Sequence, residues 1–161
     1  MRTKGIIIIV LIIIFVLAFF CFNPIVIINW DFENRNITKQ EKFFKNFDFK
    51  QGKWKCYLVN NDNDVSSLVP NGKVLETSDT SILIQLQNVN FLYPRSDMAT
   101  IESLIYLYKD NELIFCTSIW LGENRAGMQT SEFGWIEAKN PQYFCELFGY
   151  FKRSYKPIYI F

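Results

Sequence analysis

The chain has 161 residues, of which 50% are hydrophobic and 17% are aromatic. Its 17 lysines and arginines almost balance its 16 acidic residues, so the net charge is +1 at pH 7, and there is no histidine. The charge balance argues against nucleic acid as a partner, since that would require a concentrated basic surface. The lack of histidine excludes catalytic triads and metal sites built on imidazole.

A short basic segment is followed by a long apolar run. Residues 1–5 contain Arg2 and Lys4, whereas residues 6–28 contain no charged side chain. A helix needs about 20 apolar residues to cross the hydrocarbon core of a bilayer. The run is longer than the apolar part of a cleavable signal, and the bulky Phe20 precedes the candidate cleavage site, where a small residue is required. We therefore expect a signal anchor that contacts the lipid bilayer through residues 6–28.

The charges at the two ends of this segment bear on its orientation. Arg2 and Lys4 adjoin the span directly and favour a cytoplasmic tip made of residues 1–5. The far side begins with Asp31 and Glu33, although basic residues follow them: Arg35, Lys39, Lys42 and Lys45. We expect a single-pass protein of the inner membrane with a periplasmic domain. The reverse topology, with a cytoplasmic adaptor domain tethered to the membrane, stays open.

Residues 30–161 have a normal length for one folded domain. Thr38 and Glu41 match a capping box and predict a short helix over residues 39–47. Residues 53–59 and 81–91 alternate sufficiently between apolar and polar side chains to predict two strands.

The second half of the domain contains a predicted hairpin. Two β-rich runs, residues 100–108 and 112–121, flank Asp110 and Asn111, which suit a tight turn. We also expect a strand over residues 133–138.

A helix and a final strand are expected at the end of the chain. Asn140 and Pro141 suit the N-cap and first position of a helix over residues 142–151. Residues 157–161 predict an edge strand that closes the sheet. The expected fold class is therefore α+β, with an N-terminal transmembrane helix and one antiparallel-sheet domain that has a short helix near each end.

No motif in the sequence selects a catalytic, cofactor or metal site. Asn60 to Asp64 resemble a calcium loop, but Val65 occupies the glycine position and Asn71 the closing glutamate position. An Asx-rich turn accounts better for this stretch. Two of the many carboxylates could hydrolyse a glycoside, but their spacing selects no pair. We expect no catalytic residue, no cofactor and no metal.

The domain contains three cysteines, Cys56, Cys116 and Cys145, and no pair of them has zinc-type spacing. The odd number favours small, buried, reduced side chains. A disulfide between Cys116 and Cys145 stays open for an oxidising compartment.

Residues 122–135 are the most suggestive part of the predicted surface. They form a polar connection between apolar elements and contain Arg125, Met128 and Trp135, which are residue types enriched where proteins touch. We take these three as the candidate partner-binding residues, although an ordinary exposed loop explains the stretch as well.

The sequence thus favours a non-catalytic, membrane-anchored binding protein with an extracytoplasmic domain and a protein partner. An immunity-type or inhibitor protein is the narrower hypothesis, and it rests on size, anchor and the lack of catalytic residues alone. The alternatives are an envelope glycan hydrolase that uses a carboxylate pair, and the cytoplasmic adaptor.

Overall fold

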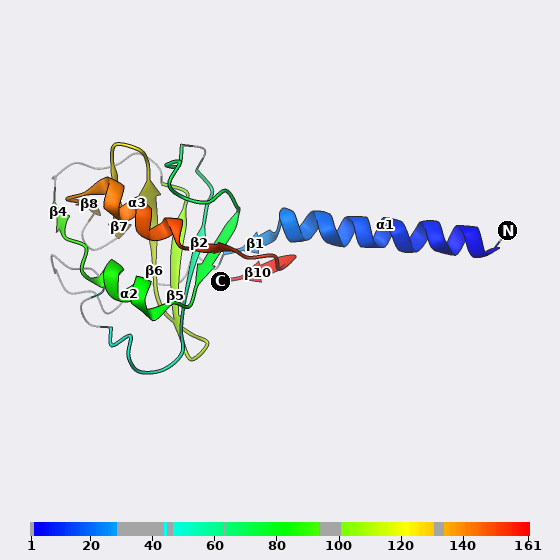
Figure 1. Ribbon diagram of the computed structural model, residues 1–161, viewed down its shortest axis with the longest axis horizontal. Helices are drawn as coiled ribbons and strands as arrows, with labels where there is room; N and C mark the ends of the chain where they lie inside the picture. The colour runs from blue at the N-terminus through cyan, green and yellow to red at the C-terminus, as the bar shows by residue number, and fades with distance from the viewer. Residues whose placement is uncertain (1, 29–43, 45–46, 63, 94–100, 131–133) are drawn as a thin grey trace.

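In the computed structural model, a long helix, α1, projects from a domain built on one large sheet (Figure 1). The structure describes all residues except 1, 29–43, 45–46, 63, 94–100 and 131–133. The predicted α+β class is confirmed, with an apolar N-terminal helix, one antiparallel sheet and short helices towards both ends of the domain. The helix predicted over residues 39–47 lies almost entirely outside the described residues.

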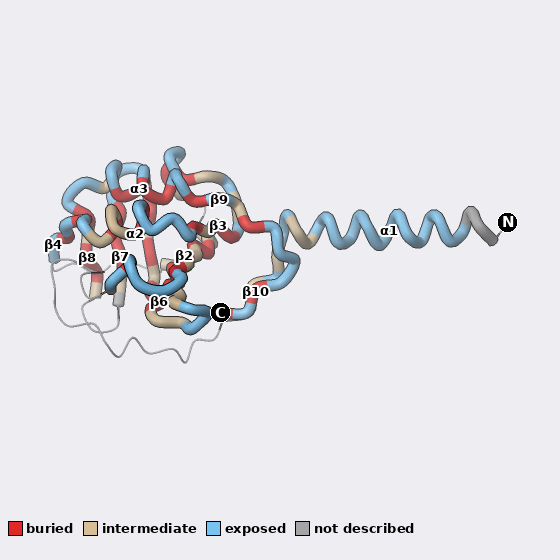
Figure 2. Tube along the Cα trace, turned by 60° about the horizontal axis from the view of Figure 1, so that its bottom comes forward, coloured by how far each residue is buried: buried red, intermediate tan, exposed pale blue. Residues whose placement is uncertain are grey.

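Helix α1 (Arg2–Phe22) is apolar on every side, so it has no face that a protein core would select. Its stretch Gly5–Phe22 is long and apolar enough to cross a membrane, and none of these 18 residues is buried. Figure 2 shows the exposed helix extending beyond the domain, whose strands are largely buried. Such a helix is compatible with a membrane anchor or a signal sequence.

The helix ends before the predicted limit of the span at Ile28. The amide and side-chain nitrogens of Asn23 both donate to the carbonyl of Phe19, at 2.9 and 3.2 Å, and so close the last turn. Pro24 cannot continue the helical hydrogen bonding. The apolar residues that follow form strand β1 (Ile25–Ile27) instead.

Eight antiparallel strands make the main sheet, in the order β4-β8-β7-β6-β5-β2-β3-β9. Their bounds are Trp54–Val59 for β2, Val74–Thr77 for β3, Phe91–Leu92 for β4, Leu104–Lys109 for β5, Glu112–Leu121 for β6, Ala126–Thr130 for β7, Gly134–Ala138 for β8 and Lys152–Arg153 for β9. The strands predicted over residues 53–59 and 133–138 are thereby confirmed.

The predicted hairpin is also confirmed as β5 and β6. Its two turn residues, Asp110 and Asn111, have φ angles of 51° and 70°. Positive φ at both central positions is typical of the type I′ turn, whose twist matches that of the strands. Because Asp and Asn tolerate this conformation better than most residues, the turn fixes the pairing of β5 with β6.

Helix α2 (Thr80–Gln87) replaces the strand predicted over residues 81–91, so that prediction is wrong. The Asp79 carboxylate caps the helix by accepting from the amide of Ser81 at 2.8 Å. Ile82, Leu83 and Leu86 then share one buried face, as helical spacing allows. Strand pairing resumes only at Phe91, in β4.

Helix α3 (Pro141–Gly149) confirms the prediction for the end of the domain. The Asn140 side chain accepts from the amide of Tyr143 at 3.0 Å, and Pro141 occupies the first turn. The apolar face that packs on the sheet contains Phe144, Leu147 and Phe148, with Phe151 just beyond the helix.

The sheet has a different covering on each face. Helices α2 and α3, together with Phe44 and Phe49, pack against one face and form the larger core. The other face supports a smaller cluster, which the end of the chain completes with Tyr159 and Phe161.

The last strand, β10 (Ile158–Ile160), does not close the main sheet as predicted. It pairs with β1 in parallel, in register from Ile25 opposite Ile158 to Ile27 opposite Ile160. This two-stranded sheet lies between α1 and the main sheet (Figure 1). It also places Tyr159, and Phe161 just beyond β10, on the second face of the main sheet, where the candidate site lies.

Candidate functional site

Strands β2 and β5 provide the floor of a pocket on the second face of the sheet. Because side chains alternate along a strand, Trp54, Cys56 and Leu58 face the larger core, and Lys55 and Tyr57 face the opposite side. The register places Tyr108 of β5 opposite Lys55. The rings of Tyr57 and Tyr108 meet edge to face with their centroids 5.8 Å apart.

The C-terminal strand adds two further rings from above the sheet. Phe161 stacks on Tyr106 with a centroid distance of 4.3 Å and an interplanar angle of 13°. It also meets the edge of Tyr57 at 5.3 Å. Tyr159 lies parallel to Phe161, at 5.8 Å, and its hydroxyl accepts from the amide of Lys156 at 3.1 Å. These contacts hold β10 as one wall of the pocket.

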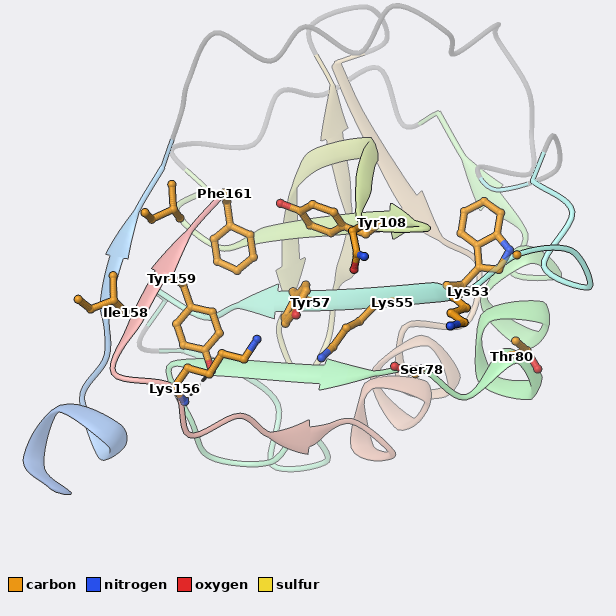
Figure 3. A pocket seen from close by; sticks show the side chains of 14 residues that line it. Lys53, Lys55, Tyr57, Ser78, Thr80, Tyr108, Lys156, Ile158, Tyr159 and Phe161 are labelled. Atoms are coloured by element: carbon orange, nitrogen blue, oxygen red, sulfur yellow. Dashed lines mark hydrogen bonds between the residues drawn. The ribbon is translucent and has the colours of Figure 1, made fainter. Parts of the chain in front are cut away.

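The resulting cavity has a volume of about 610 Å³, and we name it the aromatic–lysine pocket. Figure 3 shows Lys55 and Tyr57 at its centre, with Tyr159 and Phe161 at one end and Ser78 and Thr80 at the other. The described residues that line it are Gly52, Lys53, Trp54, Lys55, Tyr57, Ser78, Thr80, Tyr108, Asn111, Lys156, Ile158, Tyr159, Ile160 and Phe161.

The charged side chains of this lining are all cationic among the described residues: Lys53, Lys55 and Lys156. Lys55 forms an ion pair with Glu76 at 3.1 Å, and its ammonium lies 4.9 Å from the centre of the Tyr57 ring. Partial burial acts to lower the pKa of Lys55, but hydrogen bonds to Tyr57 and Glu76 outweigh burial and raise it overall. Lys53 and Lys156 are exposed at the rim. The pocket therefore presents positive charge around an aromatic floor.

A ligand for such a pocket combines an acidic group with an apolar or aromatic part. Lysine ammonium groups bind carboxylates and phosphates as mobile point charges. The tyrosine and phenylalanine rings offer apolar area, and the hydroxyl groups of Ser78 and Thr80 add hydrogen-bonding capacity at the far end.

The sequence-predicted binding residues lie elsewhere, on β7, β8 and the turn before β7. The expected loop over residues 122–135 is wrong as an element, because β7 occupies part of it and pairs with both β6 and β8. Met128 is fully buried and Trp135 is 3% exposed, so both side chains belong to the interior. Arg125 is exposed. Of these three residues, only Arg125 has an exposed side chain, and its guanidinium is paired with Glu137.

Arg125 and Trp135 are brought together by a third residue, Glu137. The Arg125 guanidinium donates to the Glu137 carboxylate at 2.8 Å, and the Trp135 indole donates to the same oxygen at 3.3 Å. Hydrogen bonding from Arg125, together with that from Trp135, holds the pKa of Glu137 below its usual value. The Trp135 ring packs closely over Gly127, where a Cβ atom would come within 2.7 Å of it. Arg125 and Trp135 therefore both bind Glu137 and help to hold β7 and β8 together.

The cysteines are free thiols, and the disulfide left open from the sequence does not form. Cys116 packs on the cluster with Tyr106 and Phe161, whereas Cys145 of α3 belongs to the core on the opposite face. Burial raises the pKa of Cys116 to about 12 and that of Cys145 to about 11, so both stay protonated near neutral pH. Protonated thiols of this kind are poor nucleophiles.

The Asx-rich stretch after β2 serves a structural purpose. The Asp62 carboxylate accepts from the amide of Ser103 at 3.1 Å, and the Ser103 hydroxyl accepts from the amide of Asn61 at 3.0 Å. These bonds fasten the end of β2 to the beginning of β5. Within the described part of the chain, no group of three or more potential acidic or cysteine ligands lies close enough to hold a metal ion.

The aromatic–lysine pocket was not predicted from the sequence, although two patterns point towards it. Tyr106 and Tyr108, and likewise Tyr159 and Phe161, are spaced by two residues, which places each pair on one face of a strand. That spacing indicates an aromatic surface. It does not reveal that the two surfaces meet, because β10 and β5 are distant in sequence.

Compared with protein-family models, curated proteins and solved structures, the chain matches none. Helix α1 and the aromatic–lysine pocket are therefore the features that bear on its function.

Proposed function

We propose that the chain is a single-pass, membrane-anchored binding protein whose domain lies on the periplasmic side of the inner membrane. The exposed, uniformly apolar α1 supports the anchor, since its Gly5–Phe22 stretch offers no polar face to water. The basic residues Arg2 and Lys4 at its beginning support a cytoplasmic tip.

The observation that carries the binding role is the aromatic–lysine pocket. Tyrosine and phenylalanine rings commonly supply the contact area of protein interfaces, and three lysines surround them here. The partner we propose is a protein that inserts an acidic residue flanked by apolar or aromatic side chains. An immunity or inhibitor protein is the narrower form of this proposal, and it rests only on the size of the domain, the anchor and the absence of a recognised catalytic motif in the sequence.

The pocket gives less support to the glycan hydrolase. Hydrolysis by two carboxylates requires a pair of acidic groups within about 10 Å that face the substrate. The described lining contributes none, and the nearby Glu76 is already engaged by Lys55 at 3.1 Å. The cytoplasmic adaptor shares the anchor and the pocket and differs from our proposal only in orientation.

Photo-crosslinking in intact cells tests the binding role. A photoreactive phenylalanine analogue replaces Thr80, which is exposed and lines the pocket. The same probe at Tyr143, an exposed position of α3 that does not line the pocket, is the matched control. We expect a discrete protein adduct from position 80 and none from position 143.

The charge of the pocket provides the second arm of this test. Replacing Lys53 and Lys156 with glutamate reverses the charge at the rim, where both side chains are exposed, and leaves the core untouched. We expect the adduct at position 80 to disappear in this variant, because the acidic group of the partner is repelled. An adduct that persists, or equal adducts from positions 80 and 143, would contradict the pocket as the binding site.

A further inference from the structure

The parallel pair of β1 and β10 has two different faces. Val26 lies opposite Tyr159, and both side chains pack into the smaller core cluster. Since side chains alternate along a strand, the neighbours of these two residues point away from the smaller core cluster. Two of them, Ile158 and Ile160, also border the aromatic–lysine pocket at its Tyr159 and Phe161 end. The four neighbours form a surface that we name the isoleucine face, consisting of Ile25, Ile27, Ile158 and Ile160.

All four side chains of the isoleucine face are exposed, with fractions of 46% for Ile25, 51% for Ile27, 53% for Ile158 and 74% for Ile160. The register places them as two adjacent cross-strand pairs, so their apolar surfaces are continuous. Single exposed apolar residues are common in soluble proteins, whereas a continuous branched apolar surface marks a contact with lipid or protein.

The isoleucine face begins three residues after α1 ends. The Gly5–Phe22 stretch has 18 residues. At a rise of 1.5 Å per residue it is about 27 Å long, slightly less than the roughly 30 Å of a hydrocarbon core. A membrane crossed by α1 therefore has its boundary close to Phe22. Ile25 and its partner Ile158 lie in the zone where headgroups and the upper acyl chains meet.

Contacts between the helix end and the domain hold the isoleucine face at this level. Arg153 of β9 donates to the carbonyl of Phe22 at 2.8 Å, which satisfies one of the free acceptors at the end of α1. Its guanidinium lies 5.2 Å from the centre of the Phe22 ring and 5.6 Å from that of Tyr155. Tyrosine is enriched at membrane–water interfaces, and arginine can keep its charged end in water while its stem lies along apolar surface.

We propose that the isoleucine face lies in the headgroup and upper acyl region of the membrane that α1 crosses. The domain then contacts the bilayer through β1 and β10, in addition to its covalent connection to α1. The continuity of this face with α1 is what favours lipid over a second copy of the chain as the occupant. The inference rests on the proposed membrane anchor, which the experiment tests separately.

Depth-dependent quenching in vesicles tests this placement. Full-length protein is reconstituted into phosphatidylcholine–phosphatidylglycerol vesicles, with Cys21 and Cys116 replaced by serine; Cys56 and Cys145 are buried and do not react with label. An environment-sensitive fluorophore is attached to one new cysteine at a time, at position 158, 25, 13 or 143. Lipids brominated in the upper or the deep part of the acyl chain serve as quenchers.

We expect the labels at positions 158 and 25 to lose emission with lipids brominated in the upper chain. The label at position 13, in the middle of α1, is expected to lose emission with deep bromine, and the label at Tyr143 with neither. Quenching at position 13 without quenching at 158 and 25 overturns the inference and leaves the anchor intact. In that case aqueous iodide shows what covers the isoleucine face. Iodide quenches the labels at a free surface and does not quench them beneath a second protein, and either result overturns the inference. An unquenched label at position 13 contradicts the anchor itself and the inference with it.

Discussion

Replacing Phe144 with alanine is expected to lower the free energy of unfolding by about 3–5 kcal/mol. Phe144 is fully buried where α3 packs on the sheet. Its ring meets Phe91 at 5.5 Å and Phe148 at 5.2 Å, both edge to face. Alanine removes these contacts and leaves a cavity between the helix and the sheet, which closes only in part. Urea denaturation of the full-length protein in detergent micelles, followed by tryptophan fluorescence, measures the loss.

Tyr143, the preceding residue, is the matched control for this variant. It lies on the same helix but is 37% exposed, and the cap at Asn140 uses its backbone amide, which alanine retains. Tyr143→Ala is expected to change stability by no more than about 0.5 kcal/mol. Equal effects of the two substitutions would contradict the packing of α3 described here.

The Phe161→Ala substitution is expected to cost about 3 kcal/mol and also to open the aromatic–lysine pocket. Phe161 is 9% exposed and stacks on Tyr106 at 4.3 Å, with a second contact to Tyr57 at 5.3 Å. Such ring pairs contribute about 0.5–1.5 kcal/mol each beyond the burial of their area. Without them β10 loses its attachment to the sheet. The same urea titration measures the stability, and the crosslinking yield at position 80 reports on the pocket.

Phe161→Leu separates the apolar volume from the ring stacking. Leucine fills most of the space and is expected to cost less than about 1.5 kcal/mol. It leaves the backbone bond from the Phe161 amide to the Ile27 carbonyl, at 3.0 Å, in place. If alanine at position 161 were as well tolerated as leucine, the stacking of Phe161 on Tyr106 would not be what holds β10 on the sheet.

The elements predicted correctly are those whose determinants are local. The hairpin of β5 and β6 follows from Asp110 and Asn111, and α3 follows from the Asn140 cap and Pro141. In each case the residues that fix the backbone lie within the element or directly beside it.

The incorrect predictions arise where two periodicities fit the same residues or where the partner is distant. The stretch after Asp79 alternates like a strand, yet Ile82, Leu83 and Leu86 equally form a helical face, and the cap at Asp79 favours the helix. Strand β7 contains Ala126 and Gly127, which are poor strand formers, and its pairing with β6 and β8 overrides that propensity.

The candidate site depends on one contact that no local pattern predicts. Strand β10 pairs with β1, which is distant in sequence, and this pairing helps to position Tyr159 and Phe161 over the main sheet. Reasoning from residue types selected Arg125, Met128 and Trp135 instead. Met128 and Trp135 are residue types enriched at protein interfaces because they are large and apolar. The same property places both of them inside the domain.

The measurement that tests the central claim most directly is the membrane topology of the full-length chain. Alkaline phosphatase is fused after Phe161, and a fluorescent protein that folds only in the cytoplasm is fused at the same point as the control. A periplasmic domain predicts high phosphatase activity, no fluorescence and a full-length product that stays in the membrane pellet after a carbonate wash. A fluorescent, phosphatase-silent product would contradict the account and place the aromatic–lysine pocket in the cytoplasm.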